Sequence, residues 1–235
     1  MTKVLVSITT CSNNWQDKIK EAKKLKLTEL AFFPTCLRDK KTRLKAYKLL
    51  ENTSIKNIPF VHLRGNMDID EIEYLIKRFN TKVFNIHSKV EHAPEYDLSK
   101  YKNEIYVENH PGYTSTSEDY LIEENMIKKY AGICLDISHL EADRLEKTKH
   151  YSIFLKYLKK YKCGVWHMSA ITSKRKHDSF ENINRFDHHT FKNLSEFNYL
   201  KKYKKFLPKF IALEVENNIA EQLGAKKYIE KLLGL

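Results

Sequence analysis

Eight short apolar runs recur along the 235-residue chain, and an amphipathic stretch follows nearly every one. This alternation is typical of repeated β/α units, in which a helix covers each buried parallel strand. The sequence predicts eight strands, at Val4–Ile8, Leu30–Phe33, Ile58–Leu63, Val83–Ile86, Ile105–Val107, Ile133–Leu135, Gly164–Met168 and Phe210–Leu213.

The stretches between these runs have helical periodicity in most cases. The predicted helices are Asp17–Leu27, Lys41–Leu50, Asp70–Phe79, Ser117–Lys129, Leu140–Tyr161, Phe191–Tyr203 and Ile219–Leu233. We expect Ser117 to cap the N-terminus of its helix. Only a short connection, Asp97–Lys102, precedes the fifth strand, and a long polar loop, Thr172–Asn184, follows the seventh.

Eight successive strand–helix steps predict a closed (β/α)8 TIM barrel rather than an open doubly wound sheet. An open sheet would more often carry a glycine-rich phosphate loop after its first strand, and the segment VSITTCSNN has none. Hydrophobic residues make up 42% of the chain, which is enough for a large core. Because no linker or repeat interrupts the sequence, we expect one domain over residues 1–235.

Four cysteines, Cys11, Cys36, Cys134 and Cys163, show no CxxC spacing, and three of them lie in or beside apolar runs. We expect all four to be reduced and structural, as in a reducing compartment. No segment approaches the roughly eighteen apolar residues of a membrane span. The N-terminus enters a strand directly, without the layout of a signal peptide, so a cytoplasmic protein without membrane contact is expected.

The most informative feature is the type of residue that follows the apolar run of each later strand. From the third strand to the eighth, each apolar run is followed by a histidine or a carboxylate: His62, His87, Glu108, Asp136, His167 and Glu214. In a barrel, the C-terminal ends of all strands meet at one rim, where active sites are built. Imidazole and carboxylate groups together suit zinc, manganese or iron. The sequence therefore predicts a divalent-metal site at this rim.

Three further residues, His139, Asp187 and His189, lie just beyond the strand ends and extend the candidate set. One such residue alone is usually a hydrogen-bonded structural side chain or a helix cap, so the prediction depends on the whole series. Glu216 rivals Glu214, since both would point the same way on a strand.

The other histidines are weaker candidates. His150 is expected on a helix surface, and His92 and His177 in polar loops. His110 and His188 neighbour better candidates, and each is a possible substrate contact or replacement ligand.

Lys and Arg exceed Asp and Glu by 42 to 30, which gives a formal net charge of +12. Such an excess favours nucleic acid or phosphorylated partners. Many of the lysines also lie in helical stretches, where they can be no more than the solvated outer faces of the barrel helices.

The order of these residues resembles the xylose-isomerase-like barrel superfamily over nearly the whole chain, and endonuclease IV (AP endonuclease family 2) in particular. That family's sequence order is His, His, Glu, Asp-x-x-His, His, Asp-x-His and Glu. This chain fills it with His62, His87, Glu108, Asp136 with His139 (DISH), His167, Asp187 with His189 (DHH), and Glu214. The resemblance implies up to three zinc ions and hydrolysis of DNA at abasic sites.

By the same resemblance, Glu108 would bridge two ions, one of them also held by His62 and His87. Asp136, His167 and Glu214 would complete the second ion. A third ion would bind His139, Asp187 and His189. A bridging hydroxide would be the nucleophile, and the basic surface would help to hold DNA.

A second branch of the superfamily, the sugar and sugar-phosphate isomerases and epimerases, resembles the chain through Glu108, Asp136, His167 and Glu214 around one divalent ion. There, Glu108 and Glu214 would transfer a proton on opposite faces of a carbon next to a carbonyl. The segments ENHPG and HMSA, and the compact length, favour this branch. A third branch, the UV-damage endonucleases, is disfavoured because Val165 stands where that family has a modified lysine.

The sequence thus favours a zinc-dependent phosphodiester hydrolase acting on DNA, because an isomerase has no need of His62, His87, Asp187 and His189 together. The alternative is an isomerase or epimerase that acts on a small sugar or sugar phosphate with one divalent ion. Glu108 and Glu214 are the expected catalytic residues in either case. Further candidate substrate contacts are Arg38, Arg64, His110 and Tyr113.

Overall fold

The computed structural model describes residues 1–12, 14–89, 93–178 and 182–235, so His92 lies outside the described residues. Its main sheet is parallel throughout the described chain. The strands of this sheet are β1 (Lys3–Leu5), β2 (Ser7–Thr9), β3 (Ala31–Phe33), β4 (Phe60–His62), β5 (Val83–His87), β6 (Ile105–Glu108), β7 (Ile133–Asp136), β8 (Cys163–Met168) and β11 (Phe210–Leu213).

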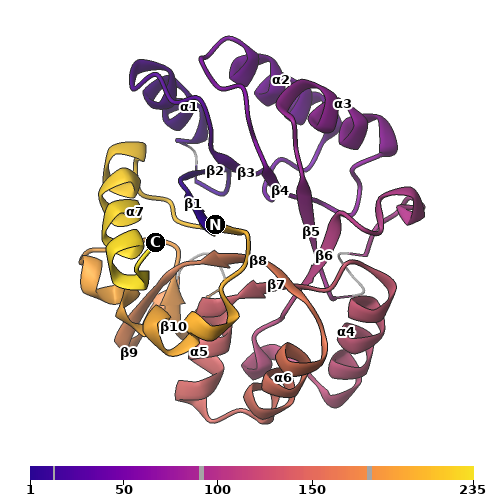
Figure 1. Cartoon of the computed structure of the whole chain (residues 1–235), viewed down its shortest axis with the longest axis vertical. Coiled ribbons are helices and arrows are strands. Elements are labelled where there is room, and N and C mark those ends of the chain that lie inside the picture. The colour runs from indigo at the N-terminus through magenta and orange to yellow at the C-terminus, as the bar shows by residue number, and fades with distance from the viewer. Residues whose placement is uncertain (13, 90–92, 179–181) are drawn as a thin grey trace.

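The sheet closes on itself through its first strand. Only Val6 separates β1 from β2, so the two are halves of one strand. The first half pairs with β11, the last strand, and the second half pairs with β3. The result is the predicted (β/α)8 TIM barrel, and Figure 1 shows its strands at the centre with α1 to α7 around them.

The helices lie close to the predicted ranges. They are α1 (Trp15–Lys24), α2 (Lys40–Glu51), α3 (Ile69–Phe79), α4 (Ser117–Lys129), α5 (Ile137–Glu146), α6 (Lys149–Lys160) and α7 (Ile219–Leu233). Shorter 3-10 segments are η2 (Ser99–Tyr101) and η3 (Gly112–Thr114), and the longer η4 (Leu194–Phe206) takes the place of the helix expected at Phe191–Tyr203.

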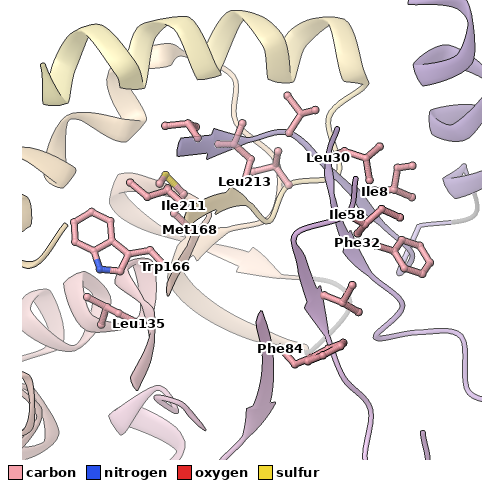
Figure 2. Packing of buried hydrophobic residues seen from close by; sticks show 14 of the residues in the cluster. Ile8, Leu30, Phe32, Ile58, Phe84, Leu135, Trp166, Met168, Ile211 and Leu213 are labelled. Carbon is pink, nitrogen blue, oxygen red and sulfur yellow. The ribbon is translucent and has the colours of Figure 1, made fainter. Parts of the chain in front are cut away.

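Alternate residues of each strand build two separate apolar layers, since successive side chains of a strand point to opposite faces. The larger layer fills the space between barrel and helices, and Figure 2 shows part of it, including Ile8, Phe32, Phe84, Trp166 and Leu213. The smaller layer fills the barrel interior. Its members are Leu5, Ala31, Phe33, Phe60, Tyr106, Cys134, Val165, Phe210 and Ala212.

Two helix predictions were wrong in detail. The single helix expected over Leu140–Tyr161 is broken, because Lys147 adopts a left-handed conformation (φ 58°) that ends α5, and Thr148 then caps α6 through the backbone N–H of Tyr151. The cap of α4 is Thr116 and not Ser117. Thr116 and Asp119 form a reciprocal capping box, a pattern that places the cap three residues before its acidic partner.

The polar loop expected at Thr172–Asn184 is instead a β-hairpin. Strands β9 (Ala170–Asp178) and β10 (Ile183–His188) pair antiparallel in a small sheet of their own. An exposed two-stranded ribbon needs no continuous apolar run, and Ser173 to His177 are all exposed. This polarity is why the segment looks like a loop in the sequence.

The prediction of four reduced cysteines was also wrong. Cys11 and Cys36 form a disulfide with a Cα–Cα distance of 4.9 Å. They follow β2 and β3, which are neighbouring parallel strands, so the loops after these strands begin side by side. Cys134 and Cys163 are free, and burial raises the pKa of Cys134 to about 12. Within the described chain, none of the helices has the length and apolar character needed to span a bilayer.

Candidate metal centre

The predicted ligands converge because they continue the inward-facing rows of the barrel interior. Five of them come two residues after a member of the interior layer, and side chains two apart on a strand share a face. These pairs are Phe60 and His62, Tyr106 and Glu108, Cys134 and Asp136, Val165 and His167, and Ala212 and Glu214. The polar residues therefore form the next layer of the interior, at the C-terminal rim.

Glu108 lies at the middle of this layer and is 3% exposed. Its Oε2 is 2.9 Å from His62 Nε2 and 3.0 Å from His167 Nε2, and its Oε1 is 3.6 Å from His87 Nδ1. Asn85 also donates a hydrogen bond to Oε2, at 2.6 Å. Burial disfavours the ionised carboxylate, but the three histidines outweigh burial and hold the pKa of Glu108 well below its usual range.

His62 is oriented as a metal ligand would be. Its Nδ1 lies 2.8 Å from the carbonyl oxygen of Leu63, and because a carbonyl can only accept, Nδ1 carries the proton. In the neutral ring, Nε2 then carries a lone pair. This atom faces the Glu108 carboxylate, with 2.9 Å between Nε2 and Oε2. Two electron-rich atoms so close together need a cation or a proton between them. The donor set thus fits a divalent ion at this point.

His167 is fully buried and connects two groups of carboxylates. Its Nε2 faces Glu108, while its Nδ1 lies 2.7 Å from Glu214 Oε2 and 3.3 Å from Asp136 Oδ2. Burial lowers the pKa of His167, but Glu108 and Glu214 outweigh it and raise this pKa well above its usual value. A neutral ring binds an ion through one nitrogen only, so the two sides of His167 are alternative ligand positions.

His139 extends the cluster outward to the hairpin. Its Nε2 lies 3.3 Å from Asp136 Oδ2, and its Nδ1 lies 3.0 Å from Asp187 Oδ2. Asp187 is fully buried, accepts a hydrogen bond from the Tyr113 hydroxyl at 3.2 Å and forms an ion pair with Arg185. Burial lowers the pKa of His139, but Asp136 and Asp187 raise it to about 9.

Three overlapping sets of ligand atoms result, each with its members within 4.8 Å of one another. They are His62 with Glu108 and His167, Glu108 with Asp136 and His139, and Asp136 with His167 and Glu214. Imidazole nitrogens and carboxylate oxygens in this mixture suit zinc, manganese or iron.

The structure separates Glu214 from its rival. Glu214 contacts His167, whereas the Glu216 carboxylate pairs with Lys18 Nζ at 2.5 Å and with the Ser12 hydroxyl. His189 lies beside Glu214 but is in none of the three sets, and its Nδ1 donates to the Glu214 carbonyl at 3.0 Å.

Arg38 and Arg64 belong to the loops after β3 and β4. In the described part of the chain, no hydrogen bond or ion pair joins either arginine to the three ligand sets, so their roles stay predictions.

Two asparagines that the sequence pattern did not single out hold the candidate ligands in place. Asn85 lies two residues before His87 on the same strand face, and that spacing was the available signal. Asn109 clamps the Asp136 backbone, because its Oδ1 accepts from the Asp136 N–H at 2.8 Å and its Nδ2 donates to the Asp136 carbonyl at 3.0 Å. Nothing in the sequence pattern distinguishes Asn109 from an ordinary loop residue.

His150 was expected on a helix surface, and this was wrong. The side chain is fully buried between Asp143, 2.7 Å from Nδ1, and Glu123, 2.9 Å from Nε2. Burial lowers the pKa of His150, but the two carboxylates raise it to about 9. The polar residues beside His150 in the sequence of α6 indicated an exposed position, so the burial was not predicted.

No family model matches this sequence, and no curated protein matches it. Solved structures do. One is a xylose isomerase-like TIM barrel protein from Mycobacterium smegmatis in complex with magnesium, with 11% identity over 99% of this chain and 97% of that one, and a TM-score of 0.52. Another is a xylose isomerase-like TIM barrel/4-hydroxyphenylpyruvate dioxygenase fusion protein, with 13% identity over 99% of this chain and 44% of that one, and a TM-score of 0.56. These similarities show the fold alone, a TIM barrel like that of the two proteins.

An AP endonuclease, family 2, from Brucella melitensis is also similar, with 8% identity over 95% of this chain and 97% of that one, and a TM-score of 0.48. It is one of several distant structures and does not stand out among them. The expectation that the chain is nearest to endonuclease IV gains no support from this similarity.

The two rim glutamates allow a matched test of the ligand assignment. We expect Glu214→Gln to lower the affinity for zinc by roughly 10- to 100-fold, because it removes an anionic donor beside His167. Glu216→Gln removes the same charge but should leave zinc affinity unchanged, since Glu216 faces Lys18. Zinc competition with a chromophoric chelator measures both. Equal losses in the two variants would contradict the assignment.

Proposed function

We propose that the chain is a metal-dependent phosphodiester hydrolase that cleaves DNA at abasic sites with a multinuclear, zinc-type centre. The observation that supports this is the extent of the ligand cluster. Contacts of 2.7 to 3.6 Å connect eight histidines and carboxylates end to end: His62, His87, Glu108, Asp136, His139, His167, Asp187 and Glu214. A zinc ion takes four or five ligands, so a set of eight has room for more than one ion.

In this proposal Glu108, Asp136 and His167 each belong to two of the three sets. Glu108 and Asp136 would be the shared ligands, because a carboxylate can bind two ions, whereas a neutral imidazole binds only one. Bound divalent ions supply Lewis acidity, a lowered pKa of water, and stabilisation of charge on phosphoryl oxygens. Asn85 donates to the Glu108 carboxylate, and Asn109 holds the backbone of Asp136 in place. Arg185 and Tyr113 do the same for Asp187, so the chain's own contacts preorganise the site.

The hairpin offers a surface for a nucleic acid backbone. Lys174 and Lys176 are exposed on β9, and neither forms an ion pair with a carboxylate of the described residues. Lys176 lies opposite Arg185 in the hairpin register, and Arg185 pairs with Asp187 at the edge of the cluster. Lys174 and Lys176 therefore present positive charge to solvent on the strand that pairs with the strand of Arg185 and Asp187, and we expect them to bind a phosphate backbone.

The activity itself is the first test. We expect the zinc-loaded chain to incise a duplex that contains one abasic site, and a chelator to abolish the incision. Glu108→Gln should lower the incision rate roughly 100-fold or more, since it removes the charge shared by two ligand sets. Glu29→Gln is the control, because Glu29 pairs with Lys3 at the opposite end of the barrel. No incision by zinc- or manganese-loaded protein would rule out the proposal.

The hairpin surface has its own test, which needs no catalysis. Lys174→Ala with Lys176→Ala should weaken binding to a 20-base-pair duplex and reduce the slope of log K against log salt by about 1.8, if each lysine neutralises one phosphate. Lys23→Ala with Lys24→Ala, in the last turn of α1, removes the same charge from another surface and should leave the slope unchanged. Fluorescence anisotropy over a salt series gives both values, and equal slopes for the two pairs would refute this surface.

One observation favours the second candidate, an isomerase or epimerase with a single ion. Glu108 and Glu214 lie at opposite nitrogens of His167, as two acid–base groups on either side of a substrate would. This function predicts exchange of a substrate C–H proton with solvent over a panel of ketoses and ketose phosphates, and loss of that exchange in Glu108→Gln or Glu214→Gln. Proton NMR in D2O measures this exchange. If no sugar or sugar phosphate of the panel takes up deuterium, the isomerase or epimerase function is excluded.

A further inference from the structure

A second buried ionic group lies outside the metal centre, where α4, α5 and α6 meet. Its members are Glu123, Asp143 and His150, exposed by 2%, 0% and 0%. Ionised carboxylates only accept hydrogen bonds, so both ring nitrogens of His150 donate and the ring is a cation between two anions. We call these three residues the buried trio.

The remaining carboxylate oxygens of the buried trio hold the loop that follows β6. Glu123 Oε1 accepts from the backbone N–H of His110 at 3.1 Å. Asp143 Oδ1 accepts from the backbone N–H of Gly112 at 2.7 Å. His150 thus connects the two anchors of one short rim loop through a single ring.

The loop is seated closely on this group. A Cβ atom added at Gly112 would lie 2.3 Å from His150 Cβ, 2.9 Å from Asp143 Oδ1 and 2.9 Å from Thr148 Oγ1. These distances are shorter than van der Waals contact, so any larger residue at position 112 would push the loop away from the buried trio. Close contact with the buried trio therefore fixes the position of this loop.

Two side chains of this loop, His110 and Tyr113, face the candidate metal centre. The Tyr113 hydroxyl donates to Asp187, and the His110 ring lies 5.8 Å from the His87 ring. Both ring nitrogens of His110 are buried, and neither has a hydrogen-bond partner in the described part of the chain. A buried polar group without a partner costs about 1–3 kcal/mol, so the fold keeps His110 there at the expense of stability.

We propose that the buried trio is a positioning group for His110, and that His110 donates a hydrogen bond to a phosphate-type oxygen of the ligand at the metal centre. This inference rests on the proposed function, because it takes a phosphate ester as the ligand. His110 would touch the ligand, whereas Glu123, Asp143 and His150 would act only through the loop.

Binding of inorganic phosphate to the zinc-loaded chain tests the inference without any turnover. Isothermal titration should show about tenfold weaker binding for His110→Ala, the loss expected for one hydrogen bond to a charged oxygen. His150→Gln, which can reach only one carboxylate, and Gly112→Ala, which keeps every charge, should each weaken binding by a similar factor. Zinc content should be the same in all variants.

The combined variants separate positioning from general stability. If the buried trio acts through His110, adding Gly112→Ala to His110→Ala should weaken phosphate binding no further. Gly224→Ala is the matched control, since a Cβ there meets nothing within 4 Å, and it should bind phosphate normally. Fully additive losses, unchanged binding in Gly112→Ala, or no phosphate binding by the unaltered chain would each overturn the inference. If the losses from Gly112→Ala and His110→Ala are non-additive as predicted but the chain does not incise DNA, only the proposed function is overturned.

Discussion

The closed parallel barrel forces alternate residues of every strand into one narrow interior, and the site depends on this constraint. At lower levels the inward positions hold small and aromatic residues, such as Ala31, Phe33 and Cys134. At the C-terminal rim the same rows continue with histidines and carboxylates. The Phe33 and His167 rings make an edge-to-face contact with their centres 5.7 Å apart, so the apolar layer packs directly against the polar one.

So many ionisable groups in one buried layer are stable only if positive charge balances the carboxylates. In the chain without ions, protons on His139 and His167 supply this charge, and the pKa values of both rings are raised accordingly. Metal ions bind imidazole only in its neutral form, so ions and protons compete for the same positions. The raised pKa values and the candidate metal site thus have one cause, the density of carboxylates around these rings.

The sequence was sufficient to predict the barrel and the inward direction of the ligands, because strand periodicity determines both. It also singled out Glu108, Asp136, His167 and Glu214, which the fold brings together, since each follows an apolar run. What it could not show depends on contacts between distant segments. The disulfide joins loops 25 residues apart, and the burial of His150 comes from Glu123 and Asp143, which lie on two other helices. Local pattern carries no information about either.

We propose that the rim holds more than one divalent ion. Anomalous diffraction from crystals of the zinc-loaded chain, recorded above and below the zinc edge, tests it most directly. We predict at least two anomalous peaks, with Glu108 or Asp136 as a shared ligand. A single peak bound only by Glu108, Asp136, His167 and Glu214 would contradict it and favour the isomerase. No peak within reach of these residues would remove the metal centre altogether.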